Sequence, residues 1–269
     1  MEEGKIIITM LGVRGSVPTT GEDFQEFGGA TTCVRVLAGD QEIFFDAGSG
    51  IVGIQPEANT NVTILMTHPH VDHLIGLPFF GGMSQKNRTI VFFLKKRNGM
   101  GLKQVMRCLY TPPLWPIGIA DYPANVHFQD LLWDDFLLGD VHIRTMEGNH
   151  PGGVTVYRLD YQGKSVVFAT DYEHTDKKDA ELISFAKDCS LLIYDGQYTQ
   201  EEYEKCSGFG HSTPQMGIRI AKEANAKRLL ITHHAPEHTD AVLHAMEEEA
   251  GQQWEGAAFA KCGQKIVIS

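Results

Sequence analysis

Short apolar runs dominate both halves of the chain, and most of them are bounded by Gly, Asn or Asp. Runs of roughly four to eight residues that are rich in β-branched and aromatic side chains are typical of strands. We therefore expect strands at residues 6–10, 33–37, 42–45, 62–66, 89–94, 141–145, 154–159, 165–169, 190–194, 228–231 and 265–268.

Helical spacing is found between the later strands. Thr213 followed by Pro214 is a good N-cap and first-turn pair, and apolar residues over 216–224 then recur at helical spacing. A second helix is expected from residue 239 to a stop at Gly251, and a third over 178–187. Helices beside two β-rich halves indicate an α+β protein with a layered αββα arrangement, in which two β-sheets are flanked by helices.

The chain shows no repeat, low-complexity segment or obvious linker, so we expect residues 1–269 to form a single domain. The hydrophobic fraction of 42% is ordinary for a globular protein. No apolar run approaches the roughly 20 residues of a membrane span, and the acidic start lacks the basic region of a signal peptide. We therefore expect a soluble cytoplasmic protein without a membrane partner. The five scattered cysteines are interpreted as buried thiols.

The formal net charge of −11 disfavours non-specific binding to a polyanion, so we expect small substrates and do not expect nucleic acid as a partner. One stretch, residues 86–107, is locally basic and contains no Asp or Glu. It is either a solvated face or a rim that steers anions. The proline-rich segment 110–123 is either a lid or a surface loop pinned to the core by its aromatic residues.

Three imidazoles and a carboxylate follow the apolar run at 62–66. They are His68, His70, Asp72 and His73, all within six residues. A single histidine is often a hydrogen-bonded core residue, but four such groups at one strand end would repel one another or stay unsatisfied without a metal ion. The alternation lets His68 and His70 point to one side while the other two serve a second ion. The cluster therefore predicts metal binding.

This pattern resembles the His-x-His-x-Asp-His signature of the metallo-β-lactamase superfamily, whose members are metal-dependent hydrolases with an αββα sandwich. The resemblance implies three further ligands, matched by His150, Asp171 and His233. It implies one ion on His68, His70 and His150, a second ion on Asp72, His73 and His233, and Asp171 with a solvent hydroxide bridging both.

Nitrogen and oxygen ligands suit zinc, manganese or iron, and we expect two divalent ions with zinc first. His234 is the alternative to His233 as a ligand, and we prefer His233 because it directly follows the strand. Asp46 is expected to support the histidines from behind.

Two later segments, 194–198 and 208–213, resemble the phosphodiesterase branch of the superfamily, including ribonuclease Z and cyclic-nucleotide phosphodiesterases. That resemblance implies catalytic roles for Asp195, His211 and Asp72, with Asp195 orienting His211. Asp195 stands where ribonuclease Z has a longer glutamate, which shortens its reach. Glycines over 12–29 are expected to let the backbone pass close to the site, and Arg14 is expected to contact a phosphate or to form a salt bridge.

We therefore expect a dinuclear phosphodiesterase that acts on a small cyclic or linear phosphodiester. Ribonuclease Z itself is a poorer match, because no long basic arm is evident. The alternatives are a carboxylic ester, lactone or thioester hydrolase, and a non-catalytic metal-bound binding or regulatory module. The resemblance also leaves a homodimer open.

Overall fold

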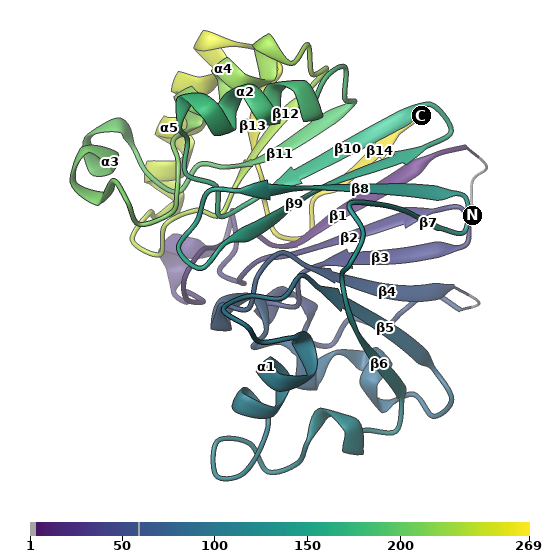
Figure 1. The fold of residues 1–269 in the computed structure, drawn as a ribbon. Helices are drawn as coiled ribbons and strands as arrows, with labels where there is room; N and C mark the ends of the chain where they lie inside the picture. Colours follow the sequence, from purple (N-terminus) through teal and green to yellow (C-terminus); the bar gives the residue numbers. More distant parts are fainter. Residues whose placement is uncertain (1–3, 59) are drawn as a thin grey trace.

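Two mixed β-sheets form the centre of the computed structural model, which describes residues 4–58 and 60–269 (Figure 1). The first sheet has the strand order β14-β1-β2-β3-β4-β5-β6. Its strands are β1 (Ile6–Gly12), β2 (Cys33–Ala38), β3 (Gln41–Phe45), β4 (Asn61–Met66), β5 (Thr89–Leu94), β6 (Asn125–Asp130) and β14 (Lys265–Ile268). Strands β3 to β6 run parallel, so their carboxyl ends meet at one edge.

The second sheet has the order β13-β12-β11-β10-β9-β8-β7. Its strands are β7 (Asp135–Leu138), β8 (Val141–Gly148), β9 (Val154–Tyr161), β10 (Lys164–Ala169), β11 (Leu191–Asp195), β12 (Leu229–Thr232) and β13 (Ala257–Phe259). Strands β10 to β13 are parallel, which again places several strand ends side by side.

The main core lies between the two sheets. Phe45 of β3 stacks on Phe168 of β10 with ring centroids 5.0 Å apart, and it also packs on Tyr157 of β9 at 5.6 Å. All three rings are buried. Because fully burying such a side chain is worth about 1.5–3 kcal/mol, these contacts hold the sheets face to face. They also fix the distance between the two sets of strand ends.

Helices cover the outer faces of both sheets (Figure 1). α2 (Asp176–Phe185), α4 (Pro214–Glu223) and α5 (Asp240–Gln253) bury their apolar sides against the second sheet. α1 (Leu102–Leu109) covers the first sheet, and the short α3 (Gln200–Cys206) stands apart from both. This arrangement confirms the expected αββα sandwich; whether residues 1–269 form one domain stays a prediction.

Some boundaries differ from the sequence expectations. Strands β6, β7 and β13 and helices α1 and α3 were not predicted. Gly251 does not end α5, because the helix continues to Gln253 and the Trp254 N–H still bonds to the Ala250 carbonyl. The interpretation of all cysteines as buried is also wrong, since Cys108 on α1 is exposed.

Aromatic contacts pin the proline-rich segment to the first sheet's outer layer. The Tyr110 hydroxyl donates to the Leu74 carbonyl at 2.5 Å, and Trp115 packs edge-on against both Tyr110 and Phe79. The Trp115 indole N–H also reaches the Tyr122 hydroxyl at 3.3 Å. These contacts favour the pinned-loop interpretation over a lid.

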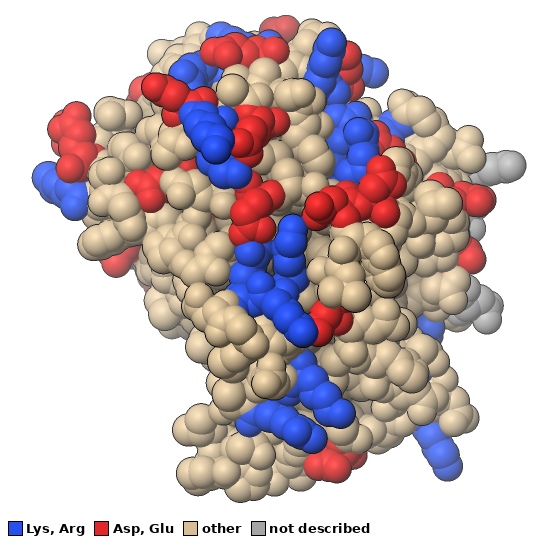
Figure 2. Space-filling model, in the orientation of Figure 1, with Lys and Arg blue, Asp and Glu red and all other residues tan. Residues whose placement is uncertain are grey.

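Acidic neighbours offset much of the basic stretch. Lys95 pairs with Asp134 at 3.0 Å, Lys96 with Asp130 at 3.2 Å, and Arg97 with Glu147. Figure 2 shows acidic and basic side chains interspersed down the middle of the face it presents. The stretch is therefore less cationic in the fold than in the sequence.

Among the described residues, every helix is too short or too polar to cross a lipid bilayer.

Candidate metal centre

The loop that follows β4 carries the first group of candidate ligands. β4 is buried, and a sharp turn fixed by Asp46 follows it. The Asp46 carboxylate accepts the Thr67 N–H and the Thr67 hydroxyl, each at 2.8 Å. A 3-10 turn, Val71–His73, then places Asp72 and His73 on the inner side of the loop. The sequence thus forms a rigid ligand-bearing loop at the edge where the parallel strands end.

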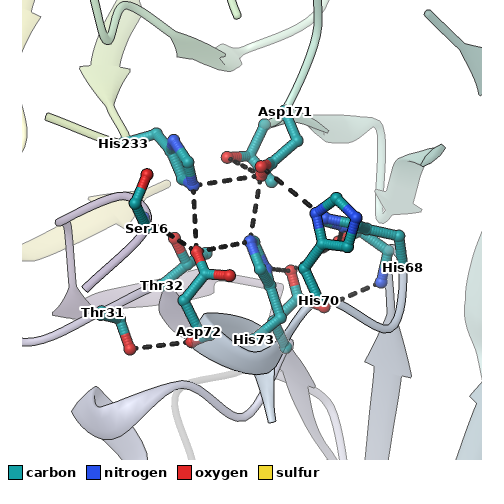
Figure 3. Close-up of polar contacts among 12 residues, drawn as sticks. Ser16, Thr31, Thr32, His68, His70, Asp72, His73, Asp171 and His233 are labelled. Atoms are coloured by element: carbon teal, nitrogen blue, oxygen red, sulfur yellow. Dashed lines mark hydrogen bonds and ion pairs between the residues drawn. The ribbon is translucent and has the colours of Figure 1, made fainter. Parts of the chain in front are cut away.

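The second sheet contributes its residues from three separate strand ends. His150 lies after β8, Asp171 after β10 and His233 after β12. Asp171 and His233 both have a left-handed backbone, with φ of 52° and 63°. Such strained conformations in non-glycine residues cluster at functional sites. Here they turn both side chains across the gap toward the β4 loop (Figure 3).

The Asp171 carboxylate lies between two groups of imidazoles. Its Oδ1 is 3.8 Å from His68 Nε2 and 3.9 Å from His150 Nε2. Its Oδ2 is 3.2 Å from His73 Nε2 and 3.3 Å from His233 Nε2. Each carboxylate oxygen therefore faces a different group, as expected of a residue that bridges two ions.

Both groups form compact ligand sets. The ligand atoms of His68, His70 and His150 lie within 4.8 Å of one another, as do those of Asp72, His73 and His233. In the second group Asp72 Oδ2 is 3.2 Å from His73 Nε2 and 3.6 Å from His233 Nε2. His70 is the exposed member, so the centre opens to solvent on its side.

Three buried ring nitrogens at this centre, the Nε2 atoms of His68, His73 and His233, have no hydrogen-bond partner. A buried polar atom without a partner is costly, and coordination to a metal ion removes that cost. Imidazole and carboxylate donors suit a divalent ion such as zinc. The residues present therefore fit a divalent metal centre.

The surroundings of the centre shift the pKa values of its histidines in opposite directions. Burial, and then the neighbouring His73, hold the pKa of His68 well below its usual range, which leaves the neutral form that binds metal ions. Burial also opposes charging of His73, but Asp171, Asp72 and Asp46 outweigh it and raise its pKa well above the usual range. The carboxylates thus attract a cation, whether a proton or a metal ion.

Hydrogen bonds behind four of the five candidate imidazole ligands fix their rings, and they come from four different residues. Asp46 Oδ2 is 2.8 Å from His73 Nδ1, and Gln197 Oε1 is 2.9 Å from His233 Nδ1. The remaining two pairs are His68 Nδ1 with the Thr67 hydroxyl at 3.0 Å and His150 Nδ1 with the Gly210 carbonyl at 2.9 Å. Each contact turns the opposite nitrogen, Nε2, toward the centre.

His211 and Asp195 form a pair beside the centre. His211 Nδ1 is 3.0 Å from Asp195 Oδ2 and 4.0 Å from Asp171 Oδ1. The shorter side chain of Asp195 therefore reaches its histidine. Burial opposes protonation, but the charge and hydrogen bond of Asp195 outweigh it and raise the pKa of His211 to about 8. Protonated His211 is thus available near neutral pH.

Two other sequence candidates lie away from the centre. His234 is buried, stacks on Phe259 and bonds through Nε2 to the Ala260 carbonyl at 2.9 Å. Arg14 is buried and its guanidinium donates to the carbonyls of Gly28, Ala235 and His238, while its contact with a phosphate oxygen stays a prediction.

Close passage of the N-terminal backbone is found at Gly15. A Cβ there would lie 2.4 Å from His233 Nδ1, so only glycine fits without a shift. The N–H of the next residue, Ser16, donates to Asp72 Oδ2 at 3.0 Å. The N-terminal loop therefore orders Asp72 and His233 directly.

Sequence reasoning missed Thr67, Gln197 and the carbonyl of Gly210 as partners of the imidazoles. Gln197 and Gly210 lie in the two segments that resembled phosphodiesterases, which was an available signal. Thr67 had no such signal, because any hydroxyl can accept from a ring nitrogen and only the fold selects one.

Comparisons with known proteins cover most of the chain. A family model described as the beta-lactamase superfamily domain matches residues 41–234. Ribonuclease Z of Brevibacillus brevis is 33% identical, with 87% of each chain covered, and ribonuclease Z of Haloferax volcanii is 24% identical over 97% of this chain and 94% of its own. The metallo-beta-lactamase fold protein YhfI of Bacillus subtilis superposes with a TM-score of 0.73 at 19% identity, covering 98% of this chain and all of that one.

Proposed function

Because the chain belongs to the metallo-β-lactamase superfamily, on its phosphodiesterase-like branch, and is a metal-dependent phosphoric diester hydrolase, we propose that it cleaves phosphodiester bonds in RNA. The position of Asp171 between two imidazole groups carries this proposal. It supports a dinuclear centre, and the His211–Asp195 pair supports transfer of a proton beside it.

The proposal of an RNA substrate replaces the expectation, drawn from the net charge, that nucleic acid is not a partner. Relatives that align over 87% and 97% of this chain are ribonucleases, and they argue against excluding nucleic acid. A small cyclic or linear phosphodiester stays the second candidate. The net charge of −11 and the pairing of Lys95, Lys96 and Arg97 with acidic residues favour it, since both weaken attraction to a long polyanion.

We assign the ligand sets as the geometry groups them. His68, His70 and His150 would hold one ion, Asp72, His73 and His233 the other, and Asp171 would contact both. Divalent ions bound there activate water and offset the charge that develops on phosphoryl oxygens. The Nδ1 atoms of His68, His73, His150 and His233 are held from behind, so these residues present their Nε2 atoms without rearrangement.

His211 is proposed to act as the general acid. Asp195 occupies its Nδ1, which leaves Nε2–H to donate to a phosphoryl oxygen or to the departing alkoxide. Asp195 also accepts the N–H groups of Asp171 and Ser212, so the same carboxylate fixes the acid relative to the ligands. The charge and hydrogen bond of Asp195 also stabilise the His211 imidazolium, since both raise the pKa of His211.

The test is hydrolysis by the wild-type chain and His211→Ala, each reconstituted separately with zinc, manganese or iron. The substrates are an end-labelled RNA, bis(p-nitrophenyl) phosphate and a thioester. We expect phosphodiester turnover that falls about 10²–10⁴-fold in the variant, because loss of a general acid typically costs that much.

The substrate series separates the candidates. RNA cleavage with little turnover of the small diester supports the first proposal, and the reverse supports the second. Thioester turnover alone, under every metal, would overturn both and favour the acyl-hydrolase alternative. Binding of RNA or nucleotide without turnover would favour the non-catalytic alternative.

A further inference from the structure

Glu173 holds the loop that carries His211, although it lies on a different segment. It is buried, with 7% of its surface exposed, and it follows Asp171 by two residues. Its Oε1 accepts the Gly208 N–H at 2.5 Å and the Tyr203 hydroxyl at 3.2 Å, and its Oε2 accepts the Gly210 N–H at 3.0 Å. The partners of this buried carboxylate are therefore two backbone N–H groups and a phenol.

Gly210 connects Glu173 to the candidate ligand His150. Its N–H donates to Glu173 while its carbonyl bonds to His150 Nδ1 at 2.9 Å. Its φ of 97° lies in the left-handed region, and a Cβ would lie 2.2 Å from the same ring nitrogen. The peptide of Gly210 thus lies directly against the His150 imidazole, and no other residue fits there without strain.

Further hydrogen bonds connect Glu173 to the segment that carries His150, which completes a closed cycle of contacts. The Glu173 N–H donates to the Asn149 carbonyl at 2.9 Å, and the Asn149 side-chain amide donates to the Glu173 carbonyl at 3.1 Å. Glu173 therefore bonds to Asn149, the residue before His150, and to Gly210, whose carbonyl contacts the His150 ring. The residue after Gly210 is His211, so the same carboxylate restrains a ligand and the acid.

We infer that Glu173 is a positioning residue that couples the His150 ligand to the His211 loop, an inference that rests on the proposed function for its catalytic half. Each oxygen of the Glu173 carboxylate accepts the N–H of a different glycine from the same loop. This pair of bonds holds Gly210, and through its carbonyl the ring orientation of His150, within a narrow range.

The test compares Glu173→Ala and Glu173→Gln in the full chain. Zinc affinity, measured by competition with a chromophoric chelator, is the readout that does not depend on turnover. We expect it to weaken about 10–100-fold in Glu173→Ala, the usual effect of removing a group that orients a ligand. Glu173→Gln should lose less, because its amide oxygen still accepts from one of the two glycine N–H groups while its nitrogen cannot.

Tyr203→Phe is the matched control. It removes the phenol bond to Glu173 and leaves both glycine bonds, so zinc affinity should stay at the wild-type value. With bis(p-nitrophenyl) phosphate, kcat should fall in the Glu173 variants more than KM rises, because His211 is displaced while the site stays open.

Each outcome decides the inference. Wild-type zinc affinity in folded Glu173→Ala and Glu173→Gln would overturn it, and so would an equal loss in Tyr203→Phe. If Glu173→Ala does not fold, Glu173→Gln carries the test alone. A wild-type chain without phosphodiesterase activity, whose Glu173 variants still bind zinc more weakly, would refute the proposed function but not the positioning role.

Discussion

At the scale of single residues, two adjacent histidines at the end of β12 have opposite surroundings. His233 projects to Asp171 and Asp72, whereas His234 is buried against Phe259 and bonded to the Ala260 carbonyl. Burial lowers the pKa of His234 to about 3, so it is neutral at physiological pH. One position therefore belongs to the candidate centre and the other to the core.

Alanine substitutions should separate these two roles. His233→Ala should lose about one equivalent of tightly bound zinc with a modest change in apo-protein stability. His234→Ala should keep the zinc stoichiometry and lose roughly 2–4 kcal/mol of unfolding free energy, because it leaves a cavity and an unpaired carbonyl. Metal analysis after dialysis and denaturant unfolding of the apo proteins measure both. Zinc loss in His234→Ala alone would show that the two assignments are reversed.

Four of the candidate ligands, His68, His70, Asp72 and His73, form one local signature that itself predicts metal binding, whereas the other three came only from the resemblance to the superfamily. The fold brings all seven side chains to one place. Sequence reasoning did not find Glu173 or Gln197, because their roles depend on loops that only the packed sheets bring together. It also gave no indication of the carbonyl partners of Arg14 at Gly28 and Ala235, which only the fold brings close to it.

At the scale of elements, the cap of α4 lies immediately beside the His211 segment. Thr213 is buried, and its hydroxyl accepts the Met216 N–H at 3.3 Å. α5 begins in the same way, with Thr239 accepting the Val242 N–H at 3.4 Å. The two helices thus share a capping device, but only one of them borders the candidate acid.

Thr213→Ala and Thr239→Ala should each cost about 1 kcal/mol of unfolding free energy, the typical effect of removing an N-cap. Only Thr213→Ala should also reduce kcat, because the freed end of α4 shifts the residues next to His211. Thermal unfolding and steady-state hydrolysis of bis(p-nitrophenyl) phosphate measure the two effects. Equal kcat in both variants would mean that the cap does not contribute to placing His211.

The helices and strands that were not predicted differ in how much their sequences indicate. α3 begins with a capping box in which Thr199 and Glu202 bond reciprocally, and this was a usable signal. α1 has apolar residues at helical spacing, but Lys and Arg lie between them, and the segment was interpreted as part of a basic stretch. The edge strand β7 alternates exposed and half-buried positions, so its burial contrast is low.

At the scale of the whole molecule, the candidate centre joins the two sheets. The first sheet supplies its ligands from the loop after β4, and the second supplies His150, Asp171 and His233 from three strand ends. Without an ion, the sheets are held mainly by apolar contacts such as Phe45 on Phe168. A bound ion would add a link at the edge where the inter-sheet core opens to solvent.

Metal removal should therefore lower the melting temperature. Free zinc at 100 times its dissociation constant for one site stabilises the folded state by about 2.7 kcal/mol, which corresponds to roughly 5–10 °C for a chain of this size. We expect a chelator to lower Tm by at least that amount, and by more if both sites are filled, and added zinc to restore it. In Asp171→Asn the shift should shrink, because Asp171 faces both ligand groups, while His234→Ala should keep the full shift from a lower starting Tm. A wild-type Tm that does not respond to chelation would mean that the two sheets are held at this edge without any contribution from the ions.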